Sequence, residues 1–384
     1  MTISVIPNLR RLSPQDDYHY FFGYYDVPAF SRDDRLHLAH RVPFWDRLPC
    51  EDDVAELGFI ERGKSTFTPL ATTTAWNFQQ GSMLQWFAGN DTDEIIFNLP
   101  DKSTFGSCIL NVNTGEKRIY PMPVANVDRQ GHYALSVNFC RMFDFRAGYG
   151  YAGKADPWKE QNHPADDGIY LQDFRDGSVK LILSLQQIWE FSRQWLPQQD
   201  RKIMVNHITF NPSGTRFVAL ARYFPLKGVD TGWKTLPITA NIDGSGLRAM
   251  KNNYIMASHY FWKNDDVLMI YAEGESGNQL YEWNDRTGEE HAIDPSVFLK
   301  DGHCSYSPDG KLVLYDSYPD KELEQQLFYY NLAEHQQTHF GKLYSYQQDH
   351  DIRCDLHPRW SRGGDVISLD SNHEGSRHIY ELDV

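Results

Sequence analysis

The sequence has 384 residues, a formal net charge of −15, a hydrophobic content of 41% and an aromatic content of 14%. Because it is acidic and has no run of Lys or Arg, nucleic acid and anionic membranes are poor partners for it. It has no apolar run long enough to span a membrane, and its first residues lack the apolar stretch of a signal peptide, so we expect a cytoplasmic protein. The five cysteines are odd in number and dispersed, which argues against a disulfide framework.

A short phrase recurs along the chain. In its clearest copy, HCSYSPDGKLVLY from His303 to Tyr315, a histidine is followed by an aromatic residue, a Ser-Pro-Asp-Gly turn and an alternating apolar stretch. Pro and Gly suit the dihedral angles of a tight turn, and alternation with period two is typical of a strand. The copies of the phrase begin, in chain order, at Val27, Met83, Val124, His207, His259, His303 and His357.

These repeats predict the architecture. Further apolar strands follow each phrase, so each repeat supplies about four strands, and the repeats average about 55 residues. We therefore predict an all-β fold, a seven-bladed β-propeller of four-stranded antiparallel blades. The N-terminal segment ISVIP would complete the last blade, so that pairing of the N- and C-terminal strands closes the propeller. The sequence contains no linker-like stretch, and we expect residues 1–384 to form a single domain.

Two loop insertions interrupt the repeats, near 140–168 and near 186–203. The first, NFCRMFDFRAGYGYAGKADPWKEQNHPADDG, carries Arg146 and Tyr149, and long loops on rigid scaffolds often hold functional residues. The second has apolar residues at helical spacing and predicts a short helix. Ahead of the second phrase, Trp76 and Gln80 are candidates for binding a hydroxyl-rich ligand, although residues of this kind also satisfy buried loop backbone.

Four phrase histidines, from consecutive repeats, precede the inner strand of their repeat. We expect their imidazoles to converge at one face, although repeat proteins also use histidines structurally. One chemistry that fits is metal binding, for which His303, His357 and Cys354 offer nitrogen and sulfur donors that suit Zn²⁺ or a similar ion. Asp316 and Asp370, at the far ends of the following strands, are candidates either to support these ligands or to have a structural role. The other chemistry is proton transfer by a neutral histidine.

The phrases HITFNPSG, SHYFWKNDD, GHCSYSPDG and LHPRWS resemble the seven-bladed oligogalacturonate lyases. The stretches AWNFQQGSMLQW, NFCRMFDFRAGYGY and RCDLHPRWSRGGDVISLDSNHEGSRHIY are closer to the related ulvan and rhamnose–glucuronate lyases. The resemblance spans nearly the whole chain. It implies cleavage next to a uronic acid by β-elimination, assisted by a divalent metal ion such as Zn²⁺ or Mn²⁺.

The resemblance also implies roles for individual residues. His303 and His357 match metal-binding histidines, His259 matches the proton-abstracting base, and Lys234 lies near the position of the catalytic arginine. Tyr149 matches the tyrosine that transfers a proton in the ulvan-type enzymes. The chain departs from both patterns at four positions, where the families have a glutamine or a histidine and this sequence has Ile352, Asp355, Gln79 and Leu99.

The sequence therefore predicts a lyase that acts on uronate-containing oligosaccharides. We expect His259 or His207 to act as the base and Tyr149 as its acid–base partner. The cations Arg146, Arg222 and Lys234 are available to bind the substrate carboxylate. A non-catalytic sugar-binding or scaffold propeller is the alternative, and a hydrolase is a third reading that would need two facing carboxylates. The sequence does not specify the sugar, the metal or the oligomeric state.

Overall fold

The chain folds almost entirely into short antiparallel strands. The computed structural model describes residues 6–87, 93–196, 200–230, 232–250, 256–346 and 349–384. These residues form seven four-stranded antiparallel sheets and two helices. The fold is therefore a seven-bladed β-propeller, which confirms the predicted architecture. By its contacts the chain divides into two compact units. The prediction of one domain remains a prediction.

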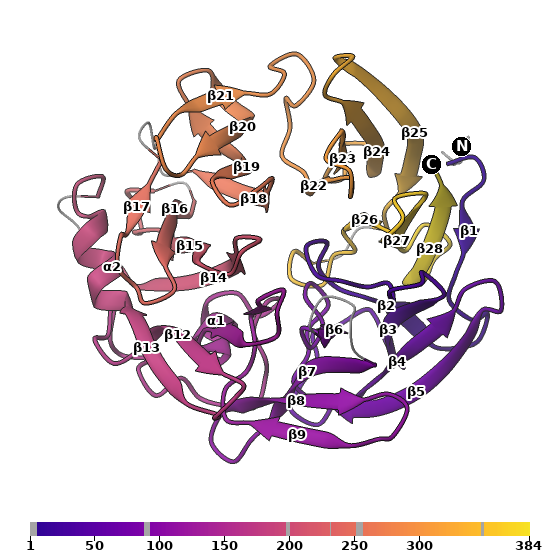
Figure 1. The fold of residues 1–384 in the computed structure, drawn as a ribbon, viewed down its shortest axis with the longest axis horizontal. Helices are drawn as coiled ribbons and strands as arrows, with labels where there is room; N and C mark the ends of the chain where they lie inside the picture. Colours follow the sequence, from indigo (N-terminus) through magenta and orange to yellow (C-terminus); the bar gives the residue numbers. More distant parts are fainter. Residues whose placement is uncertain (1–5, 88–92, 197–199, 231, 251–255, 347–348) are drawn as a thin grey trace. The chain divides into compact units, whose positions relative to one another are not determined.

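The first unit comprises Met1–Ile119, Arg146–Gly153 and Gly302–Val384. It holds four sheets, with strand orders β2-β3-β4-β5, β6-β7-β8-β9, β22-β23-β24-β25 and β1-β28-β27-β26 (Figure 1). The strands are β1 Arg10–Arg11, β2 His19–Phe21, β3 Leu36–Val42, β4 Ala55–Glu61, β5 Thr66–Thr73, β6 Gln85–Trp86, β7 Glu94–Pro100, β8 Phe105–Asn111, β9 Lys117–Tyr120, β22 Cys304–Tyr306, β23 Leu312–Asp316, β24 Glu324–Asn331, β25 Gln336–Tyr344, β26 Arg359–Trp360, β27 Val366–Ser371 and β28 His378–Asp383.

The second unit comprises Tyr120–Phe145 and Lys154–Asp301. It holds three sheets, whose strands follow chain order from β10 to β13, from β14 to β17 and from β18 to β21. The elements are β10 Asn126–Val127, β11 Tyr133–Ser136, α1 Phe139–Phe145, β12 Gly168–Asp173, β13 Val179–Ser184, α2 Leu185–Ser192, β14 Ile203–Phe210, β15 Arg216–Tyr223, β16 Lys234–Asn241, β17 Arg248–Ala249, β18 Ala257–Trp262, β19 Val267–Gly274, β20 Gly277–Asn284 and β21 Glu290–Ala292.

One sheet of the first unit joins the two ends of the chain. β1 pairs antiparallel with β28, where Arg10 lies opposite Glu381, and the Arg10 guanidinium also binds the carboxylate of Asp383 at 2.6 Å. This confirms that N- and C-terminal strands share a blade. The described pairing strand is Arg10–Arg11, and the first three residues of the predicted segment ISVIP (residues 3–7) lie outside the described residues. The pairing covers an edge that would otherwise be open.

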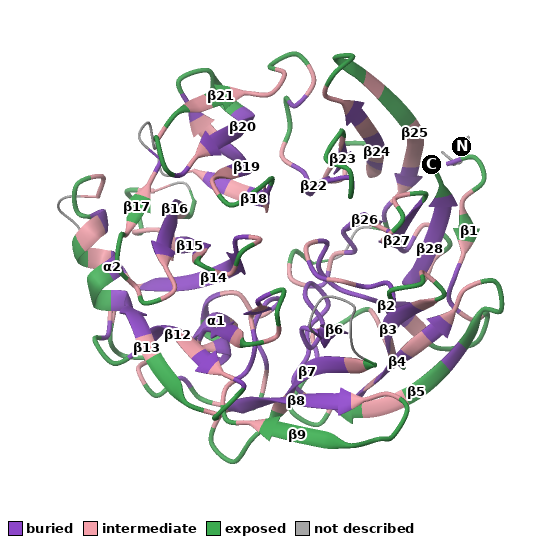
Figure 2. Cartoon of the chain, in the orientation of Figure 1, coloured by how far each residue is buried: buried purple, intermediate pink, exposed green. Residues whose placement is uncertain are grey.

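An apolar core joins the sheet of β22–β25 to the sheet that contains β26, β27 and β28. Leu314 and Leu327 from the first sheet belong to one buried cluster with Ile367 and Leu369 from the second, and all four are fully buried. Figure 2 shows β28 of the second sheet largely in the colour of buried residues. Burial of each such side chain contributes about 1.5–3 kcal/mol. This packing fixes β22 and β26 relative to each other, and the two phrase histidines of the first unit lie at the starts of these strands.

The histidines of the second unit lie inside their strands, not before them as predicted. The register of β14 with β15 shifts between Asn206 and Ile208, so His207 occupies a bulge with φ of 47°. The register of β18 with β19 shifts between Ala257 and Tyr260, a stretch that contains His259. A bulge re-aims a side chain relative to the regular ladder. Both imidazoles therefore owe their orientation to a local irregularity.

The insertion near 140–168 is anchored by a buried polar cluster in the second unit. It begins with α1, and its Arg141 binds Asp156 at 3.0 Å as well as several backbone carbonyls. Asn138 donates hydrogen bonds to both Asp156 and Asp167, each at 2.9 Å. The second insertion contains the predicted helix, α2, whose N-terminus has a capping box formed by Ser184 and Gln187.

This cluster makes the stability of the fold depend on pH. Burial raises the pKa of Asp167 to about 6, and the nearby charge of Asp156 adds to the rise. The folded state therefore keeps a proton that the unfolded chain releases, and stability falls as pH rises from about 4 to about 6. We expect Asp167→Asn to reduce that fall by about 2–3 kcal/mol, measured by urea unfolding across this range. An unchanged pH dependence in the variant would contradict this assignment.

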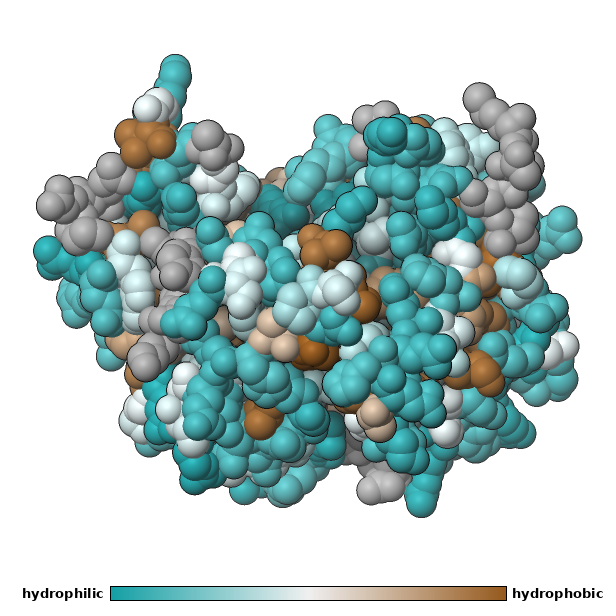
Figure 3. Space-filling model, turned by 90° about the horizontal axis from the view of Figure 1, so that it is seen from above, coloured by the Kyte–Doolittle hydropathy of each residue, from teal (hydrophilic) through white to brown (hydrophobic). Residues whose placement is uncertain are grey.

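Hydrophilic residues cover most of the face shown in Figure 3. In the described part of the chain the large hydrophobic residues that are exposed occur singly or in small groups: Tyr18, Val54, Ile119, Val179, Val229, Trp233, Leu299, Tyr346 and Val384. Neither of the two described helices combines the length and the apolar character required to cross a lipid bilayer.

Candidate functional site

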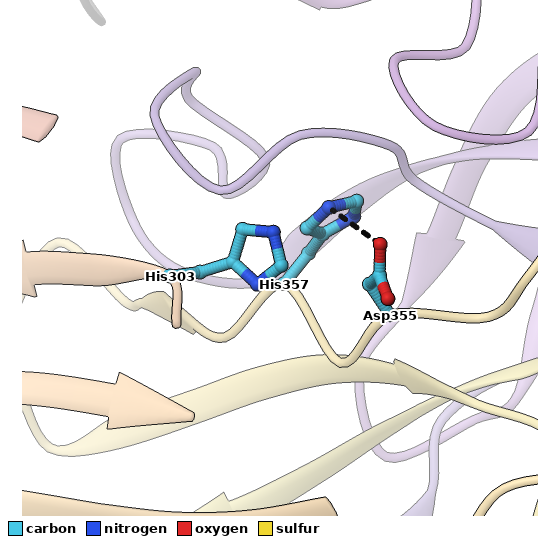
Figure 4. Close-up of side chains that lie close together, drawn as sticks. All are labelled: His303, Asp355 and His357. Atoms are coloured by element: carbon cyan, nitrogen blue, oxygen red, sulfur yellow. Dashed lines mark ion pairs between the residues drawn. The ribbon is translucent and has the colours of Figure 1, made fainter. Parts of the chain in front are cut away.

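Two histidines and one aspartate of the first unit come together at the starts of neighbouring strands. His303 directly precedes β22, His357 lies two residues before β26, and Asp355 is two residues further back. The potential ligand atoms of the three side chains all lie within 4.8 Å of one another. The imidazole centroids are 4.3 Å apart, and His357 Nε2 lies 4.0 Å from Asp355 Oδ2 (Figure 4). All three residues are at most 2% exposed. We call them the donor group.

The orientation of His303 is set by Asp316, the last residue of β23. The Asp316 carboxylate accepts a hydrogen bond from the His303 backbone N–H at 2.7 Å and lies 2.9 Å from the ring Nδ1. Because a carboxylate only accepts hydrogen bonds, Nδ1 carries the proton, and Nε2 is left as the donor atom for a metal ion. Such carboxylate–histidine pairs are typical of metal ligands. Asp316 thus contacts His303 as a supporting residue would, and its role at a metal site remains a prediction.

Asp370, the other candidate, lies in β27 and binds Arg359 at the start of β26. Its carboxylate binds the Arg359 guanidinium at 2.7 Å and accepts hydrogen bonds from the backbone N–H groups of Phe22 and Gly23. These bonds hold the segment that follows β2 against the donor group. The segment leaves the ladder of its sheet after Phe21 and rejoins it through an isolated bridge at Phe30.

This segment, residues 22–29, lines the donor group with aromatic rings. The ring of Tyr24 lies 5.0 Å from that of His357, and the ring of Tyr25 lies 5.3 Å from that of His303. The next residue, Asp26, has a carboxyl group whose pKa burial raises to about 7, although its own backbone hydrogen bond and the charge of His303 oppose the rise.

Arg353 connects the donor group to Tyr149. Its Nε binds the Asp355 carboxylate at 2.8 Å, and its Nη2 donates a hydrogen bond to the Tyr149 hydroxyl at 3.0 Å. Burial opposes the charge of Arg353, but the neighbouring Asp355 and Tyr149 outweigh burial, so the pKa of the guanidinium lies above its usual range. Arg353 lies before the repeat phrase that begins at His357, so the phrase does not point to it.

Tyr149 belongs to a flap, residues 146–153, that lies on the segment before the donor group. Arg146 stacks over the Tyr149 ring, with its guanidinium carbon 4.2 Å from the ring centroid. A Cβ at Gly148 would lie 2.4 Å from the Asp351 carbonyl oxygen, so only glycine permits this close approach. Tyr149 itself is 1% exposed. The flap is thus packed onto residues 351–355, and its tyrosine is directed toward Arg353.

The second unit contains a separate histidine–aspartate pair. His259 Nδ1 lies 3.0 Å from Asp301 Oδ1, which fixes the tautomer and leaves Nε2 as the basic atom. Arg222, on β15, donates hydrogen bonds to Thr235 at 2.8 Å and to the carbonyl of Ala257 at 3.3 Å. Arg222 therefore lies next to the strand that carries His259. Asp301 was not singled out by the repeat phrase.

The other predicted residues have varied surroundings. Lys234 begins β16, opposite Tyr223, in the same sheet as His207. The predicted convergence of four imidazoles combines residues of both units and remains a prediction, as does the role of each residue in the reaction. What the structure brings together is His303 with His357 in the first unit.

Three predicted residues of the first unit are enclosed by protein. Trp76 is fully buried, and its indole N–H donates to the Asp53 carbonyl at 2.7 Å. The backbone N–H of Gln80 donates to the Asn77 side chain at 2.8 Å. Cys354 is outside the donor group, and burial raises the pKa of its thiol to about 12, which keeps it protonated. The third residue of the donor group is Asp355, and metal binding by Cys354 remains a prediction.

The donor group fits a divalent metal ion by the chemistry of its atoms. Two imidazole nitrogens and one carboxylate oxygen form a set that suits Zn²⁺, Mn²⁺ and other first-row ions. The ligand atoms are close enough to share one ion, and His303 already has its carboxylate partner. Three other buried histidines have serine hydroxyls as partners, and burial lowers their pKa: His37, His40 and His378.

No protein-family model matches the chain, and no curated protein sequence is similar to it. Among solved structures, it is similar to an oligogalacturonate lyase from Vibrio parahaemolyticus, with a TM-score of 0.65 and 16% identity over 97% of this chain and 93% of that one. It is also similar to the β-propeller domain of the Trilobed protease from Pyrococcus furiosus (TM-score 0.52, 11% identity, 94% and 96% covered). A third similar structure is the Cps50 (Swd1) β-propeller domain from Myceliophteria thermophila, with a TM-score of 0.51 and 11% identity over 100% of this chain and 100% of that one. At these identities the comparisons show a β-propeller fold.

Proposed function

We propose that the chain is a carbohydrate lyase that cleaves uronate-containing oligosaccharides by β-elimination with a divalent metal ion. The observation that carries this proposal is the buried donor group of His303, His357 and Asp355, with Asp316 orienting His303. The similarity of fold to a protein described as an oligogalacturonate lyase supports the same conclusion. The three donor residues would hold the ion, which would neutralise the charge that develops on the uronate carboxylate.

The reaction needs two proton transfers besides this neutralisation. A base removes the proton next to the uronate carboxylate, the electron pair forms a carbon–carbon double bond, and the bond to the glycosidic oxygen breaks. An acid then gives a proton to the departing oxygen. Tyr149 is the acid in this proposal, because the Arg353 guanidinium binds both its hydroxyl and the Asp355 carboxylate of the donor group. The base stays assigned to His259 or His207, and the Asp301 partner of His259 suits that task.

The test is incubation with a panel of uronate oligosaccharides in the presence of Mn²⁺ or Zn²⁺. We expect growth of the ultraviolet absorbance of an unsaturated uronate and fragments whose summed mass equals that of the substrate. A gain in mass of one water would indicate hydrolysis instead. If metal binds but no oligosaccharide in the panel is cleaved, the non-catalytic sugar-binding propeller becomes the better description.

A further inference from the structure

The guanidinium of Arg353 binds both a proposed metal ligand, Asp355, and the proposed acid, Tyr149. Its Nε binds Asp355 at 2.8 Å, its Nη2 donates to the Tyr149 hydroxyl at 3.0 Å, and its Nη1 donates to the His350 carbonyl at 2.7 Å. The guanidinium carbon also lies 5.2 Å from the centroid of the Tyr318 ring. With its side chain only 13% exposed, Arg353 is held from several directions at once.

The direction of the bond to Tyr149 matters for proton transfer. A guanidinium can only donate hydrogen bonds, so the Tyr149 oxygen accepts in this bond, and the bond does not use the hydroxyl's own hydrogen. A fixed positive charge at 3.0 Å also stabilises the phenolate that remains once that hydrogen is given away. A lysine could supply the charge, but it lacks the rigid fork that reaches two partners.

We propose that Arg353 is a positioning residue that fixes the Tyr149 hydroxyl relative to Asp355 and so links proton transfer to the metal site. This inference rests on the proposed function, because it assigns Tyr149 and Asp355 the parts they have there. It adds a residue to the site that touches neither the proposed metal ion nor the substrate and acts through its two neighbours.

The position of Tyr149 can be measured without any turnover. A fluorinated tyrosine placed at 149 gives one fluorine NMR signal, which is compared in the native protein, Arg353→Gln and Arg353→Lys. Arg62→Gln is the matched control, since Arg62 is also a partly buried arginine, and it binds Glu381 at 2.6 Å in the same unit. Circular dichroism checks that each variant is folded. If Arg353→Gln does not fold, Arg353→Lys is used for the comparison instead.

We expect a narrow signal in the native protein and in Arg62→Gln, and a shifted signal at least about twice as broad in Arg353→Gln. Addition of Zn²⁺ alone should shift the native signal, because the ion and Arg353 share Asp355, and the shift should disappear in Arg353→Gln. Arg353→Lys should broaden the signal less than Arg353→Gln. A signal of unchanged position and width in both Arg353 variants would overturn the inference.

The same samples separate this inference from the proposed function. If calorimetry detects no Zn²⁺ binding to the native protein, the metal centre fails, while the metal-free spectra still decide whether Arg353 fixes Tyr149. If Zn²⁺ binds and moves the Tyr149 signal equally with and without Arg353, the metal centre stands and the proposed link is wrong.

Discussion

Replacing His303 by alanine is expected to weaken divalent metal binding at least about 100-fold and, with it, to suppress cleavage of uronate oligosaccharides. The imidazole is one of only three side chains in the donor group, and it is 1% exposed, so water reaches its place poorly. Because loss of an outer partner of a metal ligand alone weakens binding about 10–100-fold, loss of the ligand should weaken it at least about 100-fold. The measurement is isothermal titration calorimetry with Mn²⁺ or Zn²⁺ alone.

Asp316→Asn extends this prediction to the group that orients His303. The Asp316 carboxylate has two oxygens near His303 Nδ1, whereas an asparagine amide has one oxygen that accepts and one NH₂ group that donates. The tautomer of His303 is then no longer fixed, and we expect metal affinity to fall about 10–100-fold. His339→Ala is the control, because His339 is an exposed histidine on β25 of the same sheet. Equal metal affinity in the native protein and in His303→Ala would rule out the donor group as the binding site.

The repeat phrase was sufficient to predict that His303 and His357 lie close together. Both histidines stand three residues before the aromatic residue of their phrase, Tyr306 or Trp360, and packing of the two sheets through residues such as Leu314 and Ile367 brings those positions side by side. The third residue of the donor group, Asp355, was harder to predict. Residues 353–358 form no strand and His357 has a φ of 43°, so the period-two alternation of a strand offered no basis for choosing Asp355 over Cys354.

The rest of the site depends on packing that no local pattern encodes. Arg353 meets Tyr149 because the flap lies on residues 351–355, about 200 positions away in sequence. Trp76 illustrates the converse difficulty. Its place ahead of an inner strand suggested a ligand-binding ring, but the sequence does not reveal on which side of the loop the core lies, and the indole packs among Phe21, Phe44 and Phe78.

Tyr149→Phe should separate proton transfer from metal binding. The change removes one oxygen atom and keeps the ring, so the stacking of Arg146 and the packing of the flap are preserved. We expect kcat for oligosaccharide cleavage to fall about 10²–10⁴-fold, which is the usual contribution of a general acid or base, while KM changes little. Metal affinity should stay within about threefold, because the donor group keeps its three side chains.

Tyr151→Phe provides the matched control, since it removes a hydroxyl from the same flap two residues away. The Tyr151 hydroxyl accepts a hydrogen bond from Asn98 at 3.0 Å. Its loss should cost about 1 kcal/mol of stability and leave kcat nearly unchanged. If Tyr149→Phe and Tyr151→Phe had the same small effect on kcat, the hydroxyl at 149 would not be the proton donor, and the acid would have to be sought elsewhere around the donor group. Asp26, whose pKa lies near 7, would then be the next carboxyl group to test.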